Sequence, residues 1–227
     1  MFERIPEPEL MDDHHQVAAY SAANFNEAHQ NLINTLKSKL PQNFKPKSIL
    51  DLGCGPGDMT FRLHNNWVSA QITAVDGGEN MIEASRRYFA QLLMGGGAPI
   101  PVRWICAMLS DVTSSLHASF DLIFSNSLLH HLAKPAELWS TVKRLSVNGG
   151  FIFVSDLLRP TSITEAKSLT EKYSANEPDI LKTDFYNSLL AAYRVEEVEQ
   201  QLTDAGLSLT VEQVTDRHIV VYGSNPL

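Results

Sequence analysis

The sequence is poor in cysteine and in basic residues. Its 227 residues include two cysteines, Cys54 and Cys106, which form no CxxC motif and cannot build a disulfide framework, so we expect a reducing, cytoplasmic setting. Lys and Arg number 18 against 26 Asp and Glu, and the formal net charge of −8 disfavours binding to nucleic acid or to an anionic membrane surface. The N-terminal residues lack the pattern of a signal peptide. No apolar run reaches the roughly 20 residues that a membrane-spanning helix needs.

Short apolar segments recur through the middle of the chain. They are nearly continuous in hydrophobic residues, which is typical of parallel strands covered by helices on both faces. The intervals between them leave room for crossover helices. Five such strands are predicted, at residues 48–52, 71–75, 102–106, 120–124 and 151–154.

The two ends of the chain depart from this rhythm. Residues 1–46 are predicted to form a helical N-terminal cap, with one helical pattern from Val17 to Leu40. Helical patterns follow at residues 164–175, 179–193 and 195–205. The segment at about 161–193 is predicted to be a helical insert before the last two strands. The last two strands, residues 207–214 and 218–222, are separated only by a short turn and must pair antiparallel. The prediction is therefore an α/β, Rossmann-like domain over residues 47–227, with a mostly parallel seven-stranded sheet and a C-terminal hairpin.

A glycine-rich turn follows the first predicted strand. Gly53, Gly55 and Gly57 would let the backbone approach a ligand closely, because glycine has no Cβ. Asp76 ends the second strand, 19 residues beyond Gly57, where an acid can accept hydrogen bonds from both hydroxyls of a ribose. Together these features predict a nucleoside ligand at the carboxyl edge of the sheet.

The spacing of the glycines separates two kinds of nucleoside. A dinucleotide fingerprint is GxGxxG, whereas this turn is GxGxG, with Asp58 where the third glycine would stand. A carboxylate there opposes a diphosphate but not the cationic sulfonium of S-adenosylmethionine. Asp51, inside the first strand, could accept a hydrogen bond from the ammonium group of the same cofactor.

Four ordered motifs resemble those of the class I S-adenosylmethionine-dependent methyltransferases. They are LDLGCGPG at residues 50–57, AVD followed by MIEAS at 74–76 and 81–85, SFDLIFSN with LHHL at 119–126 and 129–132, and NGGFIFVSD at 148–156. The resemblance covers about residues 47–160 and is strongest to the small-molecule branch often labelled methyltransferase domain type 11.

The resemblance implies roles for particular residues. The three glycines would cross the methionine moiety, Asp76 and Gly77 would hold the ribose, Met81 would pack near the adenine, and Asn126 would lie beside the sulfonium. The acid that usually binds the adenine amino group is missing near Met108 and Leu109, so their backbone groups or Asp111 would take its place.

Candidate acceptor-binding residues cluster after the fourth and fifth strands. His130 could act as a general base or contact the acceptor, and Asp156 and Arg159 end the fifth strand at the ligand edge. Tyr20, Phe25 and Tyr186 could close over a small acceptor and exclude water, although core packing is the better interpretation for any single one of them. Methyl transfer depends mainly on positioning, so few residues are obligatory.

We expect no metal site and no macromolecular substrate. The rings of His130 and His131 should diverge, no third ligand has suitable spacing, and His14 and His15 are expected at a solvated helix start. The predicted function is methylation of a small molecule by a monomer or homodimer. The alternatives are a non-catalytic S-adenosylmethionine-binding protein and, with less support, an NAD(P)-binding oxidoreductase.

Overall fold

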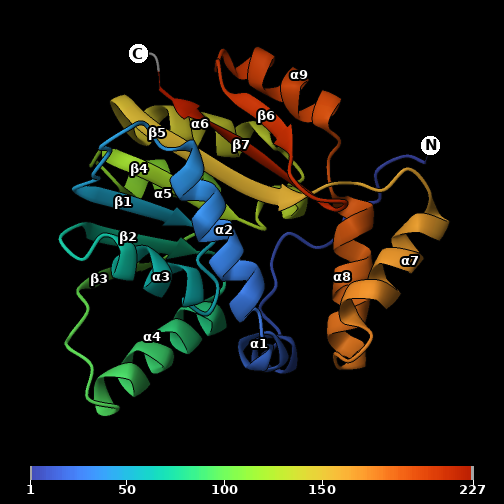
Figure 1. Cartoon of the computed structure of the whole chain (residues 1–227), viewed down its shortest axis with the longest axis horizontal. Coiled ribbons are helices and arrows are strands. Elements are labelled where there is room, and N and C mark those ends of the chain that lie inside the picture. Colours follow the sequence, from blue (N-terminus) through green and yellow to red (C-terminus); the bar gives the residue numbers. More distant parts are fainter. Residues whose placement is uncertain (1, 226–227) are drawn as a thin grey trace.

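The computed structural model describes residues 2–225, over which the chain forms one seven-stranded sheet (Figure 1). The strand order is β3-β2-β1-β4-β5-β7-β6, and β7 pairs antiparallel with both β5 and β6 while the other pairs are parallel. The predicted fold class is therefore confirmed. The strands are β1 (Ser48–Leu52), β2 (Gln71–Asp76), β3 (Val102–Cys106), β4 (Phe120–Asn126), β5 (Ser146–Leu157), β6 (Thr210–Gln213) and β7 (His218–Ser224).

Helices cover both faces of this sheet. Side chains of α2 and α3 pack on one face and side chains of α5, α6 and α9 on the other, while α4 packs against β2 and β3. Because successive residues of a strand point to opposite faces, neighbours such as Ile49 and Leu50 enter different clusters, and both are fully buried. The helices are α1 (His14–Ala22), α2 (Asn26–Lys39), α3 (Asp58–Asn66), α4 (Glu79–Met94), α5 (Leu109–Ser115), α6 (Ala136–Leu145), α7 (Ile163–Ser174), α8 (Asp179–Ala191) and α9 (Val195–Ala205), with a 3₁₀ turn, η1 (Leu129–His131).

The carboxyl ends of the parallel strands point toward α1 and toward the α7–α8 pair (Figure 1). These helices lie beyond the sheet edge rather than on its faces. Residues 2–13, before α1, run along the same edge without helix or strand and are called the strap below. The strap contacts α8 through Ile5, whose N–H donates to the carbonyl of Leu190 at 3.0 Å.

Several predicted boundaries needed correction. The single helix expected from Val17 to Leu40 is two helices, because the chain leaves helical geometry after Ala22 and resumes at Asn26. Strand β5 begins at Ser146 instead of Phe151, since Ser146 pairs with Phe120 before an irregularity in the register. Within residues 2–225, none of the helices has the length and hydropathy to cross a bilayer.

Candidate active site

The loop after β1 has the backbone geometry that its glycines predict. Gly53, Gly55 and Gly57 have φ values of 73°, 51° and 91°, a region that other residues seldom adopt. A Cβ on Gly57 would lie 3.0 Å from the Cβ of Ser85, so this glycine allows the loop to pack against α4. At Gly55, by contrast, no atom of the described residues other than Gly55 and its two chain neighbours lies within 4 Å of such a Cβ. The loop therefore presents open backbone surface at Gly55.

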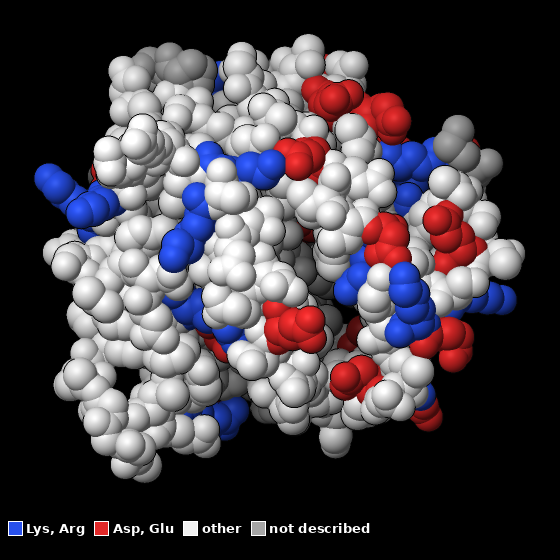
Figure 2. Space-filling model, in the orientation of Figure 1, with Lys and Arg blue, Asp and Glu red and all other residues white. Residues whose placement is uncertain are grey.

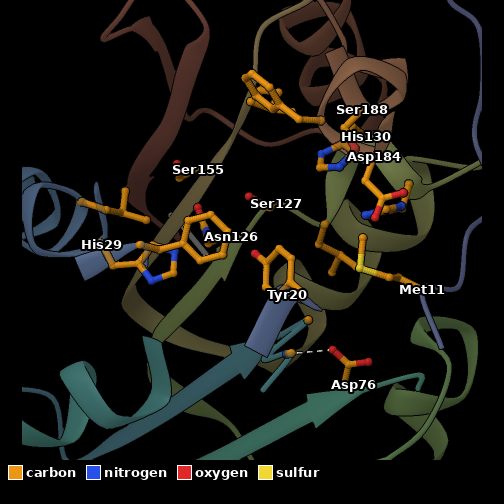
Figure 3. Close-up of a pocket in the computed structure, with 18 of the residues that line it drawn as sticks. Met11, Tyr20, His29, Asp76, Asn126, Ser127, His130, Ser155, Asp184 and Ser188 are labelled. Atoms are coloured by element: carbon orange, nitrogen blue, oxygen red, sulfur yellow. Dashed lines mark hydrogen bonds between the residues drawn. The ribbon is translucent and has the colours of Figure 1, made fainter. Parts of the chain in front are cut away.

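Asp76 connects this loop to the end of β2. Its Oδ2 accepts a hydrogen bond from the N–H of Gly55 at 2.9 Å, drawn in Figure 3, and its Oδ1 accepts one from Gly78 at 2.8 Å. Burial raises the pKa of Asp76, and the two backbone hydrogen bonds only partly offset that effect. Each oxygen keeps accepting capacity, so the carboxylate can still receive two hydroxyl donors.

Asp51 is a buried carboxylate at the other side of the loop. It is 1% exposed, and its Oδ2 accepts a hydrogen bond from Thr60 Oγ1 of α3 at 2.6 Å. Burial raises its pKa to about 7, against the lowering effect of the Thr60 hydrogen bond. A cationic group placed beside Asp51 would restore its ionised form, as the ammonium assignment requires.

Asp58 is less informative than its position in the sequence suggests. Its Oδ2 lies 2.6 Å from Nδ1 of His29 and accepts from Nε of Arg62 at 2.8 Å. Burial raises its pKa, but the hydrogen bonds from His29 and Arg62 outweigh burial and lower it. The charge of Asp58 is thus compensated within the chain, so the glycine spacing disfavours a diphosphate and Asp58 does not.

A cavity of about 530 Å³ joins these groups to the strand ends. In Figure 3, Asp76 lies at one end, His130, Asp184 and Ser188 lie at the other, and Tyr20 and Asn126 lie between them. Its lining includes the following residues predicted to bind the cofactor: Gly53, Gly55, Asp76, Gly77, Met81, Met108, Leu109 and Asn126. An adjoining hollow, which shares Gly53, Gly55 and Asn126 with the cavity, also contains Asp51.

Two aromatic residues of the N-terminal helical segment close the middle of the cavity. The ring centroids of Tyr20 and Phe25 are 5.0 Å apart, and both side chains line it. Burial raises the pKa of Tyr20 to about 12, so its hydroxyl stays protonated at neutral pH.

Figure 2 shows the hollow from outside, with acidic and basic side chains interleaved around it rather than separated into patches.

His130 stands at the far end of the cavity, held by the end of β5. Its Nδ1 lies 2.6 Å from Oδ1 of Asp156, whose Oδ2 also accepts the N–H of Leu129 at 2.7 Å. Burial lowers the pKa of His130, but the charge and hydrogen bond of Asp156 outweigh it and raise the pKa. An imidazolium has no lone pair for a proton, so the general-base role requires the neutral ring and stays a prediction.

The expectation that the two histidine rings diverge is wrong. Their centroids are 4.2 Å apart, because the pair lies in a 3₁₀ turn where both side chains face the strap. Oε1 of Glu7 lies 3.4 Å from Nε2 of His130 and 3.3 Å from Nδ1 of His131. Burial, followed by the charge of His130, lowers the pKa of His131 to about 3. By contrast, His14 and His15 are exposed at the start of α1, as predicted.

Three predicted acceptor contacts lie outside this cavity lining, and one of them is Asp156, which instead holds His130. The guanidinium of Arg159 is buried in an ion pair with Glu197 of α9, and Tyr186 packs in the interface of α7 and α8. The structure brings in residues that the sequence did not indicate, chiefly Met11 of the strap and Asp184 and Ser188 of α8. The prolines at 6 and 8, which disfavour helix, were the one available signal that the strap is extended.

Comparisons with known proteins match both the sequence and the fold. Residues 49–150 match the methyltransferase domain family. The malonyl-[acyl-carrier protein] O-methyltransferase of Anoxybacillus flavithermus is 28% identical over 67% of this chain and 55% of its own length. The trans-aconitate 2-methyltransferase of Streptomyces coelicolor is 34% identical over 46% of this chain and 33% of its own length. The chain thus spans about half the length of the first of these relatives and a third of the second.

A solved structure extends the likeness to most of the chain. The plantazolicin methyltransferase BamL, in complex with a triazolic desmethylPZN analogue and SAH, superposes with a TM-score of 0.71 at 18% identity, over 93% of this chain and 90% of that one. The fold and the loop geometry define an α/β protein in which the glycine turn and Asp76, the acid predicted to bind a ribose, lie at one sheet edge. More particularly, residues 49–150 carry a methyltransferase domain, which confirms the recognition of the class I S-adenosylmethionine-dependent methyltransferases from the sequence and the cofactor that it implies.

Proposed function

We propose that the protein transfers the methyl group of S-adenosylmethionine to a hydroxyl oxygen of a small acceptor. The observation that carries this proposal is one cavity that holds Gly55 and Asp76 at one end, Asn126 in the middle, and His130 and Asp184 at the other end. A methionine arm bound along the glycine loop would direct its sulfonium toward Asn126, and the acceptor would enter from the side of α8. Positioning of this kind can supply ~7–11 kcal/mol of the barrier.

The polar groups at the acceptor end favour a hydrogen-bond donor. Among residues 2–225, Oδ2 of Asp184 is buried without a hydrogen-bond partner, which is costly unless a ligand supplies a donor. Glu7, close to Asp184, adds a second carboxyl group. A carboxylate acceptor would be repelled by this pair, whereas a hydroxyl group would satisfy it.

An amine acceptor is the second candidate, favoured by the same observation. A protonated amine would pair with Asp184, although it must lose a proton before its nitrogen can attack the methyl carbon. Three curated relatives carry the names of O-methyltransferases or of an organic-acid methyltransferase, and all act on acceptors other than nucleic acid by name. Those names support a small acceptor without distinguishing oxygen from nitrogen in this chain.

The test is methyl transfer from isotopically labelled S-adenosylmethionine to matched alcohols, phenols, amines and carboxylic acids. Labelled ethers are expected, and exclusive labelling of amines or carboxylic acids would overturn the hydroxyl assignment. Asp184→Asn is expected to reduce kcat/KM for the acceptor at least tenfold while the affinity for S-adenosylmethionine is retained. Asp179→Asn, on the same helix with a fully exposed side chain, is the matched control and should leave both values unchanged.

A further inference from the structure

We propose that Glu7, His130 and His131 form a binding site for a divalent transition metal of the zinc type at the acceptor end of the cavity. One ligand atom from each residue lies within 4.8 Å of the others. The inference deepens the proposed function, on which it rests, and it reverses the expectation of no metal. Residues from the strap and from η1 build the site, which is why the spacing of ligands in the sequence does not reveal it.

The distances between the ligand atoms agree with tetrahedral coordination. Zinc bonds to histidine nitrogen and carboxylate oxygen are about 2.0–2.2 Å long, so two ligands of a tetrahedral site lie about 3.3–3.5 Å apart. Oε1 of Glu7 lies 3.4 Å from Nε2 of His130 and 3.3 Å from Nδ1 of His131. The structure thus holds both pairs that include Glu7 near the required separation, and the ligand atoms of the two histidines lie within 4.8 Å of each other.

The surrounding hydrogen bonds are those expected around a metal site. A histidine ligand usually donates its other ring N–H to a carboxylate, which fixes the tautomer and the ring orientation. His130 does this with Asp156, at 2.6 Å, so the lone pair of the neutral ring is on Nε2, facing Glu7. Ser188 Oγ donates to Oε1 of Glu7 at 3.0 Å and orients the carboxylate. His131 Nδ1 also lies 3.3 Å from the carbonyl of Pro8, a contact that metal binding would replace.

Three protein ligands leave the fourth position of a tetrahedral ion open, which is the arrangement of catalytic zinc sites. Both histidines and Ser188 line the cavity, so the open position faces the acceptor. A hydroxyl oxygen bound there would lose its proton to solvent more readily, because the ion stabilises the alkoxide. That oxygen would form the new bond to the methyl carbon as the carbon–sulfur bond breaks and its electron pair stays on sulfur. The products are the methyl ether and S-adenosylhomocysteine.

The competing explanation is an ion pair without a metal. A protonated His130 would donate from both nitrogens, to Asp156 and to Glu7, and would hold the strap against η1. The two explanations differ in composition, since the ion pair contains a proton where the site would contain zinc.

The test measures zinc directly on the whole chain. The protein is stripped with a chelator, dialysed against Zn²⁺ and analysed for bound metal, and Co²⁺ is then substituted to record its visible absorption. We expect one Zn²⁺ per chain and the intense visible bands of four-coordinate Co²⁺. Glu7→Gln and His131→Ala should each weaken Zn²⁺ binding at least a hundredfold, and Asp156→Asn by roughly 10–100-fold, as for the loss of a supporting hydrogen bond.

Controls separate this proposal from the proposed function. His15→Ala removes an exposed histidine, 93% exposed in its side chain, and should leave Zn²⁺ binding unchanged. Glu7→Gln should keep its affinity for S-adenosylmethionine, because Glu7 contacts none of the loop that binds the cofactor; this shows that the variant is folded. The metal site would be overturned if the unmodified protein bound no stoichiometric Zn²⁺. It would also be overturned if the Glu7 and His131 variants bound Zn²⁺ as tightly as the unmodified protein. Neither result would contradict cofactor binding or methyl transfer, because those are measured in separate assays.

Discussion

Replacing Asp51 by asparagine should stabilise the cofactor-free protein at alkaline pH. The carboxyl group is buried in the first strand, and burial raises its pKa from 3.8 to about 7. The folded state therefore binds this proton more tightly than the unfolded state does. Between about pH 4 and pH 7 the free energy of unfolding falls as pH rises, because the folded state holds a proton that the unfolded chain has already released.

The size of the effect follows from the two pKa values. A rise from 3.8 to about 7, at about 1.4 kcal/mol per pKa unit, corresponds to roughly 4 kcal/mol at pH 8. Asparagine removes this destabilising contribution. Loss of the charged hydrogen-bond partner of Thr60 lowers the free energy of unfolding by about 1 kcal/mol. The expected net gain is about 3 kcal/mol at pH 8 and close to none at pH 4.

The same substitution should weaken cofactor binding. An ammonium group beside Asp51 would lose a charged hydrogen-bond partner, worth about 1.5–3 kcal/mol, or roughly 10–100-fold in Kd. Urea unfolding at pH 5 and pH 8 measures the first effect, and calorimetry with S-adenosylmethionine measures the second. Thr60→Val is the control, since it removes the hydrogen bond but keeps the carboxylate and its pH dependence. An asparagine variant whose stability still falls with pH like the unmodified protein would refute the burial argument, and unchanged affinity would refute the ammonium assignment.

Three further predictions concern the glycine loop, the ribose-binding acid and the strap. Gly55→Val should abolish detectable cofactor binding in calorimetry. The control is Gly149→Val, at a glycine with a similarly positive φ and similarly open surroundings, and this variant should lose stability but bind normally. Normal binding by the Gly55 variant would show that the cofactor does not lie against this loop. Asp76→Ala should weaken the binding free energy of S-adenosylmethionine by ~1–3 kcal/mol, and an unchanged Kd would show that Asp76 does not contact the ribose. Arg4→Ala should lower the free energy of unfolding, measured by urea denaturation, by about 2 kcal/mol, because the Arg4 guanidinium donates to three backbone carbonyls of α8 and of the segment at η1. An unaltered urea midpoint would show that these hydrogen bonds do not hold the strap.

The cofactor half of the site could be predicted because its causes are local. A positive φ at Gly53, Gly55 and Gly57 is a property of single residues, and Asp76 reaches the loop because adjacent parallel strands end at the same edge. The bounds of helices α3 and α4 have similarly local causes. Each follows a glycine at the end of a strand turn, and Gly95 ends α4.

The acceptor half could not be predicted because its contacts are distant in sequence. Glu7 meets His130 across more than a hundred residues and Ser188 across 181, and no local pattern records either approach. The same limit explains the error about the histidine rings. Their divergence follows for a regular α-helix, but the segment is a 3₁₀ turn whose side chains are directed by the strap and by Asp156.

This division between the halves explains why the relatives reveal the cofactor better than the acceptor. The family match covers residues 49–150 and so includes the glycine loop, Asp76, Asn126 and His130, but it excludes the strap and α8. Glu7 and Asp184, which give the acceptor end its charge, both lie outside it. An acceptor inferred from this family match alone would therefore rest on the half of the site that the match covers. In the proposed function the other half selects the acceptor, so variants of Glu7 and Asp184 are the ones expected to change acceptor use while cofactor affinity stays constant.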